Sequence, residues 1–169
     1  CFISADDPKL YNDLFDTVGN MMYQIWEELL TRYGDTFAVC RFGDDLGFKT
    51  STLLSTKDLT TKVIPQYKKI IKLIHSYNKP FLLHSCGNIF EIMDDLIAVA
   101  DIDAKHSNED EIAPFSVWVE EYGDRIGNFG GVDTNILCQK EEKEIKAYVK
   151  KVIDDVKEKK NLKGFALGS

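Results

Sequence analysis

The stretch KPFLLHSCGN, residues 79–88, decides the fold. Pro80 ends the helical pattern before it, because proline has no N–H donor and its neighbour disfavours the α region. The apolar run from Phe81 to Leu83 has the length of a strand buried on both faces. The stretch therefore predicts a buried strand with His84 and Cys86 at its carboxyl end.

Helices and strands alternate outward from this stretch in both directions. Helical spacing of apolar residues covers residues 7–32, 63–74, 89–99, 115–122 and 141–159, and strands are predicted at residues 36–42, 81–83, 102–106, 125–129 and 164–167. No hairpin signal separates consecutive strands, so each helix returns the chain to begin a parallel neighbour. The pattern predicts an α/β fold with five parallel strands and about five helices.

Polar residues follow these predicted strands directly: Asp44, Asp45, His84, Cys86, His106, Asp133 and Ser169. In a (β/α)₈ barrel such positions converge on one rim, which is where barrels of this type carry out chemistry. This favours a TIM-barrel-type fold over an open doubly wound sheet. The chain begins at Cys1 without a methionine and ends after an apolar run, so we expect an incomplete, C-terminal portion of a barrel, a single partial domain over residues 1–169.

Composition excludes several classes of protein. The net charge of −7 comes from acidic and basic residues mixed on the same helices, which does not suit nucleic-acid binding. No apolar run approaches the roughly 20 residues of a membrane span, and no signal peptide is recognisable. We expect a cytoplasmic protein with free or metal-bound thiols rather than disulfides among its cysteines, which are Cys1, Cys40, Cys86 and Cys138.

His84 and Cys86 form the most informative pair. Residues i and i+2 at a strand end point to the same side, so an imidazole nitrogen and a thiolate can reach one ion. Zinc suits this mixed nitrogen and sulfur pair best. The alternative is a histidine that is only hydrogen-bonded within the core.

The other candidates keep two interpretations each. Asp44 and Asp45 could bind substrate or ligate a metal, or they could cap backbone N–H groups in a turn. His106 ends its predicted strand and could titrate near neutral pH, or it could be hydrogen-bonded without a role in function. The glycines around residues 127–131 do not form a dinucleotide fingerprint and are expected to allow close backbone approach.

Three motifs resemble landmarks of the uroporphyrinogen decarboxylase and cobalamin-dependent methyltransferase superfamily. They are Leu83-His84-Ser85-Cys86-Gly87-Asn88, Gly43-Asp44-Asp45-Leu46-Gly47 with the later Val63-Ile64-Pro65, and Gly131-Val132-Asp133-Thr134. The likeness covers nearly the whole chain from Phe37 onward. It implies the C-terminal part of the barrel of that superfamily.

The methyltransferase branch of the superfamily implies a function for the pair. In that branch a His-x-Cys pair and a later cysteine bind zinc, which activates a thiol by lowering its pKa, and His84 and Cys86 match the pair. Ser169 stands where the later cysteine is expected, so either Asp44 or Asp45 completes the site or no metal binds. The resemblance implies zinc-dependent methyl transfer between a corrinoid, carried by a partner protein, and a small thiol such as coenzyme M.

Two alternatives remain open at the level of sequence. One is tetrapyrrole decarboxylation without a cofactor, for which arginines should bind the substrate carboxylates; Arg41 and Arg125 are the only candidates near strands. The other is a noncatalytic fragment or assembly module, in which unpaired sheet edges lead copies of the chain to associate.

Overall fold

The computed structural model describes residues 2–109, 111–160 and 162–169. Cys1, one of the predicted free thiols, lies outside the described residues. The chain forms two compact units. The first comprises the residues up to Cys40 with Leu54–Phe81 and Phe90–Ile102, and the second comprises Arg41–Leu53, Leu82–Ile89 and Asp103–Ser169.

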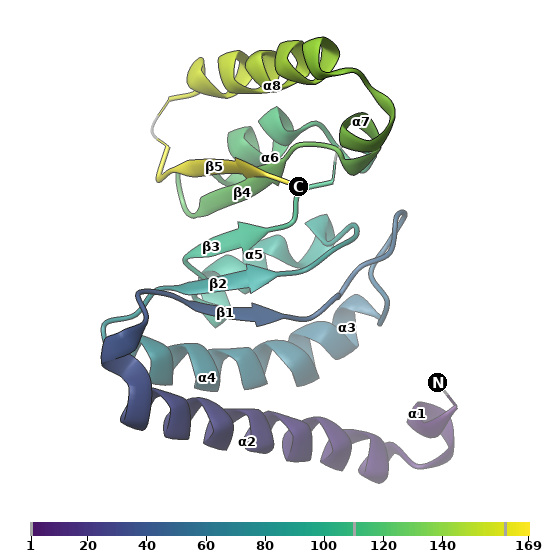
Figure 1. Cartoon of the computed structure of the whole chain (residues 1–169). Coiled ribbons are helices and arrows are strands. Elements are labelled where there is room, and N and C mark those ends of the chain that lie inside the picture. The colour runs from purple at the N-terminus through teal and green to yellow at the C-terminus, as the bar shows by residue number, and fades with distance from the viewer. Residues whose placement is uncertain (1, 110, 161) are drawn as a thin grey trace. The chain divides into compact units, whose positions relative to one another are not determined.

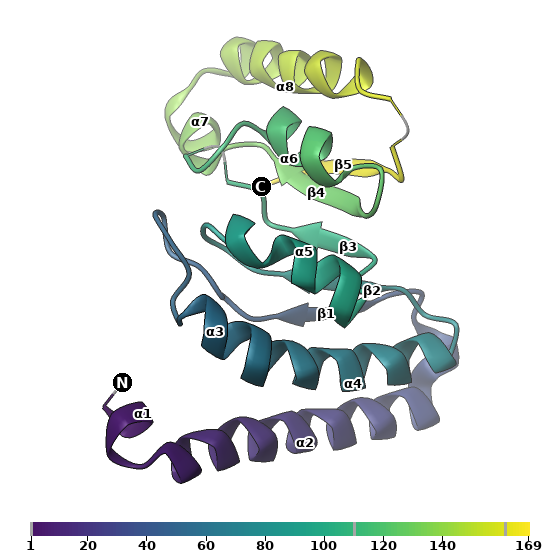
Figure 2. The same cartoon turned by 180° about the vertical axis from the view of Figure 1, so that it is seen from behind.

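The first unit is helical. Its elements are α1 (Ile3–Asp6), α2 (Pro8–Tyr33), the 3₁₀ turn η1 (Gly34–Thr36), α3 (Thr56–Asp58), the π turn η2 (Leu59–Val63), α4 (Ile64–Ser76), the 3₁₀ turn η3 (Phe90–Ile92), α5 (Met93–Asp95) and the π turn η4 (Leu96–Ala100). Figures 1 and 2 show α2 and α4 side by side. The helices predicted at residues 7–32 and 63–74 are confirmed.

The start of α2 follows from local sequence. Asp7 caps the helix by accepting a hydrogen bond of 2.9 Å from the backbone N–H of Leu10. Pro8 occupies the first helical position, where a missing N–H costs least. Gly19 lies against Gln66 of α4, so closely that a Cβ atom there would come within 2.2 Å of the Gln66 amide oxygen. The glycine therefore lets the two helices approach each other.

The sheet belongs to the second unit, apart from the first residues of its first two strands. The described residues form five strands, β1 (Cys40–Gly43), β2 (Phe81–His84), β3 (Ala104–His106), β4 (Gly127–Gly131) and β5 (Phe165–Gly168), in the order β1-β2-β3-β4-β5. The pairs β2–β3, β3–β4 and β4–β5 are parallel. A doubly wound sheet reverses its strand order, whereas barrel strands follow one another without reversal. The α/β fold class of TIM-barrel type is therefore confirmed.

Three helices of the second unit connect its later strands: α6 (Phe115–Tyr122) lies between β3 and β4, and α7 (Thr134–Gln139) and α8 (Glu142–Lys157) lie between β4 and β5. A small core joins α6, α8 and β5, built from Phe115, Val119 and Val156 with the partly buried Val152, Leu162, Phe165 and Leu167. Gly131, at the end of β4, has a φ of +86°, and a Cβ atom there would meet the Phe115 side chain at 2.5 Å. Close approach, the role expected for these glycines, is confirmed at this position.

Some predicted boundaries were wrong. The strand expected at residues 36–42 is displaced, because Gly34–Thr36 form a 3₁₀ turn and pairing begins at Cys40, whose N–H donates to the Pro80 carbonyl at 3.0 Å. The helix expected at residues 89–99 is divided into η3, α5 and η4. Helix α7 was not predicted, although Asp133 caps it. Within the described residues, no helix has the length and apolarity to cross a membrane.

Candidate metal centre

The carboxyl end of β2 brings His84 and Cys86 together. Nε2 of His84 lies 3.7 Å from Sγ of Cys86, and both side chains are half-buried. Zinc bonds of about 2.0 Å to nitrogen and 2.3 Å to sulfur place two tetrahedral ligand atoms roughly 3.5 Å apart. The separation between the two residues is therefore that of a shared zinc ion.

Asp45, in the loop after β1, supplies a third ligand atom. Ligand atoms of Asp45, His84 and Cys86 all lie within 4.8 Å of one another. An Asp45 carboxylate oxygen accepts a hydrogen bond of 2.9 Å from the Cys86 N–H. This bond holds the pKa of Asp45 below its ordinary value. Asp45 is therefore ionised and held beside the thiol.

Two glycines allow the loops after β1 and β2 to meet. Gly87 has a φ of +82°, and a Cβ atom there would lie 2.2 Å from the carbonyl carbon of Gly47. The Leu46 N–H donates to Oγ of the buried Ser85 at 3.0 Å and ties the same loops together. A side chain at residue 87 would separate Asp45 from the other two ligand residues.

His106 of β3 orients the His84 ring. The two residues are paired in the β2–β3 register, and their Nδ1 atoms lie 2.6 Å apart. One Nδ1 must donate and the other accept. When His84 donates, its Nε2 carries a lone pair toward Cys86, which is the tautomer that a metal ligand needs. Burial, the largest cause, lowers the pKa of both histidines, so the neutral rings are favoured.

The Cys86 thiol depends on a cation for its ionisation. Burial raises its pKa above the ordinary value, and the Asp45 charge raises it further, while Lys105 opposes the shift. A bound cation reverses this balance because it stabilises the thiolate directly. The cluster offers one imidazole nitrogen, one sulfur and one carboxylate oxygen, and this donor set fits zinc with a fourth position open.

The remaining predicted residues lie outside this cluster. Asp44 donates its backbone N–H to the His84 carbonyl at 2.9 Å and is half-buried. Asp133 is the N-cap of α7, where one carboxylate oxygen accepts from the N–H groups of Asn135 and Ile136 at 2.6 and 3.2 Å. Asp133, expected from the sequence as a polar residue of the rim, thus caps a helix in the structure. Exposed Ser169 lines a cavity.

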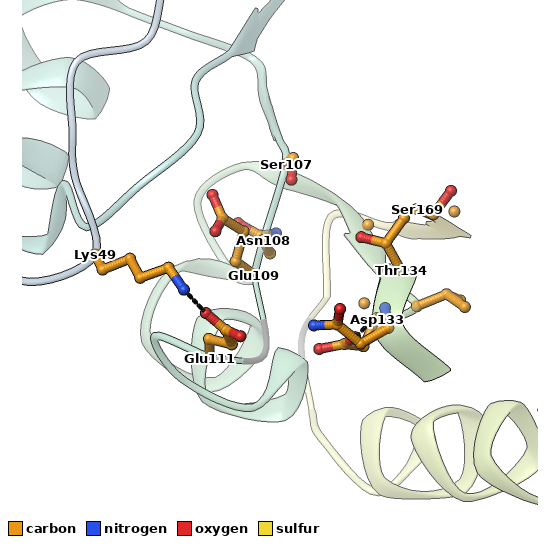
Figure 3. A pocket seen from close by; sticks show the side chains of 13 residues that line it. Lys49, Ser107, Asn108, Glu109, Glu111, Asp133, Thr134 and Ser169 are labelled. Carbon is orange, nitrogen blue, oxygen red and sulfur yellow. Dashed lines mark hydrogen bonds and ion pairs between the residues drawn. The ribbon is translucent and has the colours of Figure 1, made fainter. Parts of the chain in front are cut away.

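This cavity, of about 330 Å³, lies at the carboxyl ends of β3, β4 and β5 (Figure 3). Its lining includes Ser107, Asn108, Glu109, Asp133, Thr134 and Ser169. Lys49 and Glu111, which also line it, form an ion pair. Glu109 connects the cavity with the candidate metal centre, because its Oε1 accepts a 2.7 Å hydrogen bond from the N–H of Gly87.

Sequence reasoning missed several residues that support the centre, among them Ser85, Lys105, Asn108 and Glu109. Lys105 is fully buried behind the cluster, and its Nζ donates to oxygens of Ser85, Ser107 and Asn108. A lysine within a strand carries no signal of burial in the sequence. Glu109 follows His106 by three residues, and its contact depends on where the loop turns.

Comparison with known proteins gives one family. The family model described as Uroporphyrinogen decarboxylase (URO-D) matches residues 3–169. No curated protein matches the chain.

Proposed function

The chain belongs to the uroporphyrinogen decarboxylase family, and we propose that it catalyses zinc-dependent methyl transfer between a corrinoid and a thiol. The observation that carries this proposal is the cluster of Asp45, His84 and Cys86, with ligand atoms within 4.8 Å of one another. The three donors match a zinc site of catalytic type, which keeps one position for substrate.

Asp45 takes the place in this proposal that a later cysteine holds in the methyltransferase branch. Ser169 lines the cavity, and a serine hydroxyl is a weaker ligand than a thiolate or carboxylate. The carboxylate of Asp45 is ionised and hydrogen-bonded to the Cys86 N–H, so it is already directed to the site. We assign Asp45 as the third ligand.

The protein's own residues hold the ligands in place. His106 engages Nδ1 of His84 and leaves Nε2 directed to the site. The half-buried thiol of Cys86 is shielded from much of the solvent. Zinc, when bound, would lower the pKa of a substrate thiol and so provide a thiolate at neutral pH. A corrinoid on a partner protein is the proposed methyl donor.

The charge of the cavity favours this function over tetrapyrrole decarboxylation. A polycarboxylate substrate needs cationic side chains. Among the described residues that line the cavity, Lys49 is the only base, and it is paired with Glu111. Arg125 lies before β4, over the Tyr122 ring, and so at the amino end of the strands. Arg41 stands near the histidines, whose pKa values its charge lowers, as does the charge of the buried Lys105.

Zinc content of the purified chain tests the proposal. We expect stoichiometric zinc in the parent and loss of zinc in a His84→Ala, Cys86→Ala double variant. A His75→Ala, Cys138→Ala double variant is the matched control, because it removes the same residue types from α4 and from the exposed α7 position. A parent that binds no zinc would contradict the proposal and favour a decarboxylase or a noncatalytic module.

A second comparison tests the third ligand. Asp45→Asn should weaken zinc binding, whereas Asp44→Asn should leave it near the parent value, because Asp44 is outside the cluster. Transfer itself is measured by the loss of methylcobalamin absorbance with coenzyme M as acceptor. Uroporphyrinogen incubated with the chain gives the opposing assay, in which decarboxylated products would support the alternative.

A further inference from the structure

Lys105, in the middle of β3, is fully buried, which is rare for lysine. It is the one charged side chain among the buried residues that the structure describes. Successive residues of a strand alternate between faces, so Lys105 leaves the sheet opposite to His106. Its Nζ lies 4.4 Å from the centroid of the Trp118 ring of α6. The lysine therefore lies behind the face that bears the histidines.

The ammonium group donates to three oxygen atoms. Nζ lies 2.6 Å from the Ser107 carbonyl, 2.9 Å from Oδ1 of Asn108 and 3.4 Å from the Ser85 carbonyl. The first two acceptors follow β3 and the third follows β2. An ammonium has three N–H donors, so each can take one of these oxygens.

The position is unfavourable for a lysine that only fills space. Burial lowers its pKa from the ordinary 10.5 to about 7, and the acceptors within hydrogen-bond distance are carbonyl and amide oxygens rather than carboxylates. A methionine of similar length would avoid the desolvation of a charge. The property that methionine lacks is a set of directed N–H donors. Lys105 is therefore better explained by the oxygens that it orients than by packing.

Ser85 shows what this orientation achieves, because it joins the loop after β2 to strand β3 and to the loop after β1. Its carbonyl accepts from Lys105, its N–H donates to the His106 carbonyl at 2.6 Å, and its Oγ accepts from the Leu46 N–H at 3.0 Å. Ser85 lies between His84 and Cys86 in the chain. A shift of the peptide groups of Ser85 would therefore displace both His84 and Cys86.

We propose that Lys105 is a positioning residue, which sets the candidate metal centre by holding the loop after β2 against the loop after β3. Asn108 extends the network, since its amide donates to the Phe129 carbonyl of β4 at 3.3 Å. This inference rests on the proposed zinc site, and Lys105 acts on it only through the peptide groups and side chains that it orients.

The test compares the full chain with Lys105→Met and with Lys150→Met, an exposed lysine of α8 that pairs with Asp154 and serves as the control. Zn²⁺ affinity is measured by chelator competition, and Co²⁺ substitution reports ligand geometry through the visible spectrum. Lys105→Met should weaken Zn²⁺ binding about 10- to 100-fold, as loss of an outer partner does at metal sites. Its Co²⁺ spectrum should also change, while the control retains both parent values.

Hydrogen exchange in the absence of metal separates this inference from the proposed function. In Lys105→Met, peptides covering residues 84–88 and 107–109 should exchange at least about 10-fold faster, with α8 unchanged. A parent that binds no metal would refute the zinc proposal, yet the exchange result would still test Lys105. Parent-like exchange would overturn the inference, as would parent-like metal affinity in a chain that binds zinc. If Lys105→Met does not fold, Lys105→Gln, which keeps two N–H donors, should show a smaller change in the same directions.

Discussion

The buried ammonium of Lys105 makes stability depend on pH in a direction that can be measured. Its pKa is about 7 in the folded chain and 10.5 in an ordinary, solvated lysine, because burial disfavours the charged form. Between these values the unfolded chain binds more protons than the folded chain. The free energy of unfolding therefore rises with pH across this window. Lys105→Met removes this contribution.

The size of the effect follows from the two pKa values. One pKa unit corresponds to about 1.4 kcal/mol, and integration from pH 7.5 to pH 9.5 gives a gain of about 2.5 kcal/mol from this group. Other groups titrate in the same range, including Cys40, whose pKa burial raises. They are present in both proteins, so their contributions cancel except that of Cys86, whose pKa the Lys105 charge lowers. A Cys86→Ser background in both proteins removes this coupling, so that the difference reports the lysine.

The assay is urea unfolding in the presence of a chelator at pH 7.5, 8.5 and 9.5. Tryptophan fluorescence in a Trp26→Phe background reports on Trp118, which lies beside Lys105. The parent should gain about 2.5 kcal/mol over this range relative to Lys105→Met. Lys150→Met should follow the parent. Parallel curves for parent and Lys105→Met would refute the reasoning, because they would show that the lysine keeps an ordinary pKa in the fold.

Three further predictions concern the ligand geometry, the loop contact and association. His106→Ala should weaken Zn²⁺ binding about 10- to 100-fold in a chelator titration, because the His84 ring loses its hydrogen-bond partner. An unchanged affinity would contradict this role of His106. Gly87→Ala should lower the free energy of unfolding in urea by about 2 to 4 kcal/mol, because φ is +82° and the Gly47 backbone lies 2.2 Å from the new Cβ. Met21 and Ile25 of α2 are 57% and 49% exposed, so copies of the chain should associate through them in light scattering; glutamate at both positions should abolish this, and a monomeric parent would contradict it.

Much of the fold could be predicted because its signals are local. The apolar run Phe81–Leu83 and the proline before it identify β2 without any knowledge of neighbours. The position of β1 could not be predicted in the same way. Residues before Cys40 have strand-like composition, but a strand needs a partner, and pairing with the Pro80 carbonyl begins only at Cys40. Composition carries no information about that partner.

The candidate site shows the same difference between residues that local sequence predicts and residues that depend on contacts distant in sequence. His84 and Cys86 are two residues apart on one strand end, so their proximity follows from strand geometry. Asp44 and Asp45 were equivalent candidates at the level of sequence. Only the close contact of the loops after β1 and β2 distinguishes them, because it directs the carboxylate of Asp45, and the backbone N–H of Asp44, toward β2.

Lys105 shows why supporting residues are harder to predict than ligands. A lysine followed by a histidine in a short strand is ordinarily read as solvent-facing, and three facts distant in sequence reverse that reading. The β2–β3 register sets Lys105 level with Leu83, α6 covers it with Trp118, and the loop after β3 returns oxygen acceptors to its Nζ. Chemical identity suffices to nominate a metal ligand. The role of a positioning residue is defined by the groups that surround it, so it becomes visible only when strand register and helix packing are known.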